Sequence, residues 1–94
     1  GENAYLHRFA EESLAPLLAY DRENGTELLA TLDTYLTNQG RLAPSARQLH
    51  IHVNTLRQRL ERIEMLLKLP LDDPYNLLNL QIALRIHSVQ ARAS

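Results

Sequence analysis

The sequence predicts an all-α domain, a small bundle of about five helices that contains a helix-turn-helix. Apolar residues recur at three- and four-residue spacing along most of the 94-residue chain, and alternating β-branched runs are absent. A chain of this length can bury one modest core, so we expect a single domain over residues 1–94. Within it we expect N-terminal helices over 1–40, the helix-turn-helix over 42–67 and a last helix over 73–90.

The first 40 residues predict short helices separated by breaks. An opening helix over about residues 5–14 should end before Pro16, because proline lacks the amide hydrogen that a helix interior needs. After a turn at Asn24-Gly25, Thr26 is the predicted N-cap of a second helix, and Gly40 is its predicted C-cap. The buried sides of these two helices are predicted to carry Leu6, Phe9, Ala10 and Leu14, then Leu28, Leu29, Leu32, Tyr35 and Leu36.

The middle of the chain predicts two helices that meet across a tight turn. Pro44 suits the first turn of the first helix, where its missing amide hydrogen removes only a donor without a helical partner. Ala46 is the small residue expected where the two helices cross. The buried side of the second helix is defined by apolar residues at spacings of four, three and four: Leu56, Leu60, Ile63 and Leu67. Asp73-Pro74 then predicts the start of a last, largely apolar helix.

The charge is distributed unevenly, and this bears on the function. The net charge of −1 by itself argues against a nucleic-acid binder, since DNA affinity depends on lysine and arginine. However, residues 1–40 hold two basic side chains against seven acidic ones, whereas residues 41–62 hold five arginines against Glu61. Positive charge is therefore concentrated on the predicted helix-turn-helix, where a DNA-binding face requires it.

The exposed side of the second helix of this hairpin carries residue types that bind base edges. Arginine can pair with guanine, Asn and Gln with adenine, and an apolar side chain can contact a thymine methyl. We therefore expect base contacts from His52, Val53, Asn54, Arg57 and Gln58. Phosphate contacts, which fix the register without selecting a sequence, are expected from Arg41, Ser45, Arg47, Thr55, Arg59 and Arg62.

The same segment resembles the C-terminal helix-turn-helix of the PucR/CdaR family of bacterial transcriptional regulators and, more distantly, the Fis-type helix-turn-helix. The stretch ARQLHIHVNTLRQRLERI is close to the family pattern A-R-x-L-H-V-H-x-N-T-L-R-Y-R-L-x-R-I, and the likeness extends over about residues 13–86. It implies that Asn54, Thr55, Arg57 and Arg59 belong to the recognition helix and that Ser45 and Arg47 lie on the supporting helix. Gln58 stands where the family usually has Tyr, and Arg41 replaces a common Asn.

A cytoplasmic setting is expected because the chain has no cysteine, with association to the bacterial nucleoid when the domain is bound to DNA. The resemblance implies that this domain follows a longer, signal-sensing part. We expect double-stranded DNA as the partner, and a homodimer or higher oligomer in the full-length protein. No cofactor, metal or membrane contact is expected: the chain has no cysteine, and His50 and His52 do not share a helix face. The sequence points away from an enzyme, and the serious alternative is a helical protein-interaction or dimerisation module without DNA contact.

Overall fold

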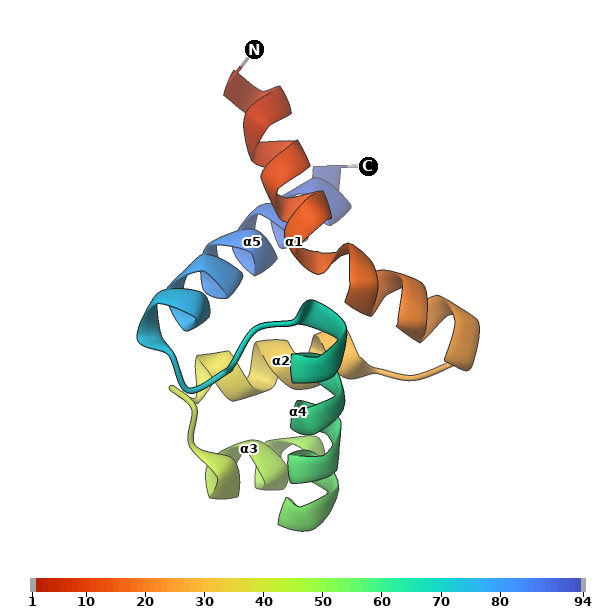
Figure 1. Cartoon of the computed structure of the whole chain (residues 1–94), viewed down its shortest axis with the longest axis vertical. Coiled ribbons are helices and arrows are strands. Elements are labelled where there is room, and N and C mark those ends of the chain that lie inside the picture. The colour runs from red at the N-terminus through yellow and green to blue at the C-terminus, as the bar shows by residue number, and fades with distance from the viewer. Residues whose placement is uncertain (1, 94) are drawn as a thin grey trace.

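A computed structural model describes residues 2–93, with the side chain of Glu2 left out, and contains five α-helices and no strand over that range (Figure 1). The helices are α1 (Glu2–Asn24), α2 (Leu28–Thr37), α3 (Leu42–Leu49), α4 (Val53–Leu67) and α5 (Pro74–Ala93). Helices α3 and α4 form a hairpin at one end of the molecule, α1 and α5 pack together at the other, and α2 lies between them (Figure 1). The predicted all-α bundle with a helix-turn-helix is confirmed.

One hydrophobic core joins the helices. It is built from leucine, isoleucine and alanine, and its members include side chains that are almost completely buried in four of the helices: Leu14, Leu17, Leu32, Leu56, Ile63 and Leu80. Burial of each large aliphatic side chain contributes roughly 1.5–3 kcal/mol to folding. Because Leu56 and Ile63 belong to this core, α4 cannot rotate about its axis without exposing apolar surface.

The prediction that the first helix ends before Pro16 is wrong. Helix α1 runs through this residue, and Figure 1 shows its axis changing direction near the middle, as expected where proline removes one helical hydrogen bond. Pro16 itself is exposed, while Leu14 and Leu17 on either side of it are fully buried. Burial of these two leucines offsets the lost hydrogen bond and keeps both halves of α1 on the core. Leu6, by contrast, is 48% exposed rather than buried.

The N-terminus of α2 is capped from α1, so the prediction of Thr26 as its N-cap is also wrong. Glu27 occupies the N-cap position and makes no side-chain cap hydrogen bond. Instead, the Asp21 carboxylate accepts hydrogen bonds from the backbone amides of Leu28 (2.8 Å) and Leu29 (3.0 Å), and from the Thr26 hydroxyl (2.6 Å). A carboxylate at this position satisfies two unpaired amides and interacts favourably with the helix dipole.

Helix α2 ends at Thr37, three residues before the predicted cap at Gly40. Gly40 nevertheless adopts the left-handed conformation, with φ +73°, and its amide donates to the Tyr35 carbonyl at 2.9 Å. The Asn38 side chain donates to Gln48 Oε1 of α3 at 2.9 Å. This turn therefore ties the end of α2 to the helix-turn-helix.

The connection from α4 to α5 is held by a carboxylate. Glu64 Oε2 accepts a hydrogen bond from the Leu71 amide at 2.7 Å, and the Leu71 side chain enters the core. Asp73 Oδ1 accepts from the Tyr75 amide at 2.8 Å, so the predicted start of the last helix at Asp73-Pro74 is confirmed. Burial raises the pKa of the nearby Tyr35 hydroxyl, and the negative charges of Glu64 and Asp72 raise it further.

Replacement of Asp21 should destabilise the fold. Asp21→Ala removes the acceptor of three hydrogen bonds, so the free energy of unfolding should fall by about 1–3 kcal/mol. Urea unfolding followed by circular dichroism measures this loss. Glu23→Ala, at an exposed position of the same helix, is the control and should change stability by less than about 0.5 kcal/mol. Equal losses in the two variants would contradict the capping role of Asp21.

Tyr35 should make the stability sensitive to alkaline pH. Its pKa is raised in the folded protein, so the unfolded chain loses this proton first. The stabilising contribution is therefore complete below the unfolded-state pKa of about 10 and is lost as the pH rises through the folded-state pKa. Unfolding free energies measured between about pH 9 and 11 should decline less steeply in Tyr35→Phe than in the unmodified chain. Parallel pH profiles would exclude Tyr35 as the cause.

Candidate nucleic-acid interface

The turn of the hairpin is closed by backbone hydrogen bonds around His50. The His50 amide donates to the Arg47 carbonyl at 3.2 Å, and the Ile51 amide donates to the Ala46 carbonyl at 3.0 Å. His50 is the C-cap of α3 and has φ 57° and ψ 42°, a left-handed conformation that glycine usually occupies. The chain therefore reverses sharply over a few residues, and α4 begins at Val53 at a fixed angle to α3.

Apolar residues hold α4, the second helix of the hairpin, against the core. Ala46 is 5% exposed where α3 meets the core, and Leu49, Ile51 and Val53 pack against the core from the turn. On α4 itself Leu56, Leu60 and Ile63 are buried, as predicted, whereas Leu67, also predicted on this side, is only half-buried at the end of the helix. The opposite side of α4 is consequently held towards solvent.

The first turn of α4 is capped by a residue that the sequence assigned to base contact. His52 is the N-cap, and its Nδ1 atom accepts a hydrogen bond from the Asn54 amide at 3.0 Å. The ring is otherwise exposed at the tip of the hairpin. His52 thus has a structural role in starting α4.

Three candidate base-contacting residues share the exposed side of α4. Asn54, Arg57 and Gln58 are exposed, and Arg57 Nη1 donates to Asn54 Oδ1 at 3.2 Å. Val53 is half-buried because its side chain also packs on the core. The structure therefore brings together a guanidinium and two carboxamides at the N-terminal end of α4, the end that a recognition helix directs into the major groove.

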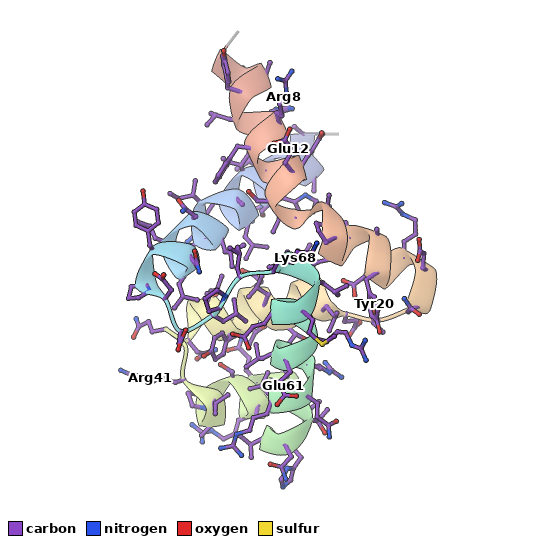
Figure 2. The ribbon with its side chains drawn as sticks, viewed as in Figure 1. Arg8, Glu12, Tyr20, Arg41, Glu61 and Lys68 are labelled. Atoms are coloured by element: carbon purple, nitrogen blue, oxygen red, sulfur yellow. The ribbon has the colours of Figure 1, made fainter. Side chains whose placement is uncertain are left out.

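The six candidate phosphate-contacting residues do not lie together. Arg41 and Arg47 are exposed on the supporting side, and Figure 2 shows Arg41 at the start of α3, on the other side of the hairpin from α4. Thr55 is half-buried on α4. Ser45 is fully buried, and its hydroxyl donates to the Arg41 carbonyl at 2.6 Å, so it does not present a donor at the surface.

Two of the arginines contact the rest of the domain. Arg59 Nη1 donates to the buried Thr31 hydroxyl of α2 at 3.1 Å, and the Arg62 guanidinium lies 5.7 Å from the ring centroid of Tyr20 in α1. Arg59 could have been recognised from the sequence, because it follows Leu56 by three positions and precedes Ile63 by four, which places it beside the buried stripe. The contact of Arg62 with Tyr20 joins residues distant in sequence, and no local pattern indicates it.

Other kinds of site have little support in residues 2–93. No group of three or more His, Cys, Asp or Glu side chains over that range could hold a metal ion.

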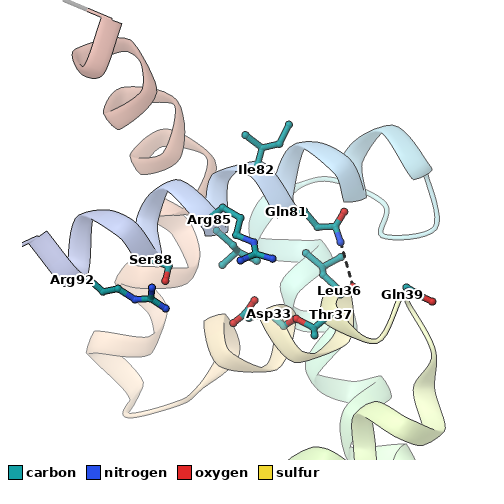
Figure 3. A pocket seen from close by; sticks show the side chains of 10 residues that line it. Asp33, Leu36, Thr37, Gln39, Gln81, Ile82, Arg85, Ser88 and Arg92 are labelled. Atoms are coloured by element: carbon teal, nitrogen blue, oxygen red, sulfur yellow. Dashed lines mark hydrogen bonds between the residues drawn. The ribbon is translucent and has the colours of Figure 1, made fainter.

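A polar cleft of about 660 Å³ lies between α2 and α5, where Asp33, Thr37, Gln81, Arg85 and Arg92 gather (Figure 3). Gln81 of this cleft donates to the Leu36 carbonyl at 3.3 Å. Within the described part of the chain, no helix has the length and apolar character needed to cross a membrane.

A short helix joined by a tight turn to a second helix with an exposed polar side is the arrangement found in helix-turn-helix DNA-binding domains. The family model described as the PucR C-terminal helix-turn-helix domain matches residues 28–86, more than half of the 94-residue chain. The chain belongs to this family, and the predicted resemblance is confirmed. The matched range runs from the start of α2 into α5 and contains the whole hairpin.

Three relatives from Bacillus subtilis (strain 168) show the same relationship. The chain is 42% identical over 72 residues to the proline-responsive transcriptional activator PutR (77% of this chain, 17% of the relative). It is 36% identical over 81 residues to the purine catabolism regulatory protein (86% of this chain, 15% of the relative). It is 34% identical over 59 residues to the DNA-binding transcriptional activator AdeR (63% of this chain, 14% of the relative).

These alignments span only between 14% and 17% of the length of the relatives. No solved structure matches the chain. The family match and the named relatives together identify a DNA-binding domain of the kind found in transcriptional regulators.

Strain at His50 gives a test of the hairpin geometry. Because His50 is exposed and has a left-handed conformation, His50→Gly should raise the free energy of unfolding by about 0.5–1 kcal/mol. Thermal or urea unfolding measures the change. Arg47→Gly, within the helical part of α3, should instead lower stability by about 1 kcal/mol. A loss of stability in His50→Gly would show that the turn has another conformation.

Proposed function

We propose that this domain binds operator DNA by inserting the N-terminal half of α4 into the major groove. The observation that carries the proposal is the exposed cluster of Asn54, Arg57 and Gln58 on a helix whose other side is locked into the core. Arg57 would pair with guanine, and Asn54 and Gln58 with adenine. His52 and Val53, at the start of the helix, would contact the adjoining base pairs.

Phosphate contacts are proposed for the exposed residues of the supporting helix. Arg41 and Arg47, at the two ends of α3, would bind phosphates on either side of the groove, and Thr55 would add a contact from α4. Ser45, Arg59 and Arg62 are proposed to support DNA binding by stabilising the fold rather than by touching the backbone, because each already has a partner within the domain.

The biological role proposed is control of transcription by a longer cytoplasmic protein. Relatives named as responding to proline and as regulating purine catabolism share this domain, so we propose that it supplies operator recognition and that the signal is sensed elsewhere. Two half-sites about one helical turn apart require two copies of the hairpin, which favours a homodimer or higher oligomer. An enzymatic role has no support in this comparison.

The division between base and phosphate contacts predicts different mutant behaviour. Arg57→Ala should lose about 1–3 kcal/mol of operator binding and tolerate changes at one base position, because a bidentate base contact is removed. Arg47→Ala should weaken binding to all sequences similarly and reduce the salt slope by about 1. Fluorescence anisotropy with operator and scrambled duplexes, over a series of salt concentrations, measures both effects.

Arg22→Ala is the matched control, since Arg22 is an exposed arginine in the last turn of α1, outside the hairpin. It should leave operator affinity and salt slope within about twofold of the unmodified chain. Equal effects of Arg57→Ala and Arg47→Ala on specificity would contradict the division of roles. Unchanged binding in both variants would mean that other residues contact the DNA, and an unmodified chain that binds neither duplex would favour the alternative of an interaction module without DNA contact.

A further inference from the structure

We propose that two copies of this chain associate through an apolar surface formed by α5 and the start of α1. This surface, here called the α1–α5 face, consists of exposed residues that the core does not use: Tyr5, Leu6, Tyr75, Leu78, Ile82 and Val89. The inference rests on the proposed function in one respect only, namely that recognition of two half-sites explains why a second copy is needed.

Helix α5 is apolar on two sides, and only one of them is buried. Leu80, Ala83 and Leu84 face the core. Tyr75, Leu78, Ile82 and Val89 follow one another at spacings of three, four and seven, which places them on one stripe of the helix. Their exposed fractions are 74%, 54%, 43% and 63%. A contiguous row of large exposed apolar side chains is typical of a protein interface.

The stripe continues into a groove between α5 and α1. This groove has a volume of about 260 Å³, and Leu6, Ile86 and Val89 supply most of its apolar lining. Tyr5, at 78% exposure, precedes Leu6 on α1. The two helices therefore present one joined surface with a hollow into which a partner side chain can insert.

The α1–α5 face lies away from the proposed DNA contacts. Among residues 2–93, the helices packed against α5 are α1 and α2, and Figure 1 shows α5 at the opposite end of the molecule from the tip of the α3–α4 hairpin. A partner seated on this face leaves Asn54 and Arg57 open to DNA.

The charges beside the face favour a second copy as the occupant. Arg85 lies three residues after Ile82, and Arg92 three after Val89, so these two exposed positive charges border the stripe on the side where α5 faces the α2–α5 cleft, and Arg85 also lines the groove with Leu6. On α1, Glu12 lies seven residues after Tyr5 and therefore on the same side of the helix, and the exposed Glu11 adjoins it. These two acidic side chains exceed the single positive charge of Arg8, so this part of α1 has a net negative charge (Figure 2). A two-fold rotation places α1 of each copy against α5 of the other, and the opposite charges then meet twice.

Sedimentation of the purified chain over micromolar to millimolar concentrations tests the surface. The unmodified chain should form dimers, and Ile82→Glu should weaken the association at least about tenfold, because a charge would be buried in the apolar contact. Met65→Glu, at a residue 68% exposed on α4, is the matched control and should leave association unchanged. A strict monomer at every concentration, or equal effects of the two variants, would overturn the proposal.

Charge reversal tests the arrangement of the two copies. The double variant Glu11→Arg, Glu12→Arg carries positive charge on both α1 and α5, so two copies of it should repel each other. The double variant Arg85→Glu, Arg92→Glu carries negative charge on both helices, and its copies should also repel. Each should associate more weakly than the unmodified chain, and an equimolar mixture should regain dimers. A mixture that remains as monomeric as its components would contradict the pairing of α1 with α5.

Binding to a single half-site duplex separates this inference from the proposed function. Ile82→Glu should retain half-site affinity within about twofold while losing dimers. If the unmodified chain forms the predicted dimers but binds no duplex, the proposed function fails and the inference stands. If it binds the half-site yet never dimerises, the inference alone fails.

Discussion

Burial of one side of α4 is the constraint on which the rest of the molecule depends. Leu56 and Ile63 are fully buried, and Leu60 nearly so, in a core to which α1, α2 and α5 also contribute. The rotation of α4 about its axis is thereby fixed, and with it the direction of Asn54, Arg57 and Gln58. A helix with the same polar residues but a loose apolar side would present these groups over a wide range of directions, and base recognition requires defined hydrogen-bond geometry.

The polar contacts around this core orient the hairpin. Asp21 joins the end of α1 to the start of α2, Arg59 joins α4 to Thr31 of α2, and Arg62 lies over Tyr20 of α1. From the sequence alone, each of these three charged side chains would be expected to face solvent. Their combined effect is that Arg59 and Arg62, two of the five arginines between residues 41 and 62, help to hold α4 in place, and the proposal assigns DNA contacts to Arg41, Arg47 and Arg57.

The parts predictable from the sequence are those set by local spacing. The apolar residues of α4 at spacings of three and four predict this helix, which runs over Val53–Leu67, and Asp73-Pro74 predicts the start of α5. The incorrect predictions at Pro16 and Thr26 have a common cause: contacts distant in sequence outweighed a local rule. Burial of Leu14 and Leu17 keeps α1 continuous through a proline, and the Asp21 carboxylate takes the place of a local threonine cap.

The same limit applies to the candidate site. The exposed side of α4 follows from its helical period, so Arg57 and Gln58 could be placed from the sequence. Ser45 and Arg62 could not, because their partners are a backbone carbonyl in the preceding turn and a tyrosine in another helix. Residue type identified groups able to bind phosphate, but three-dimensional packing decides which of them are available.

Selection from a random duplex library tests the central claim, that the fixed exposed side of α4 recognises a base sequence. The domain and its Arg57→Ala variant would be selected in parallel at low and near-physiological salt, and the bound duplexes sequenced. The account predicts an enriched motif for the unmodified domain and a loss of preference at one or two of its positions in the variant. An absence of any enriched motif, or an identical motif from both proteins, would contradict it.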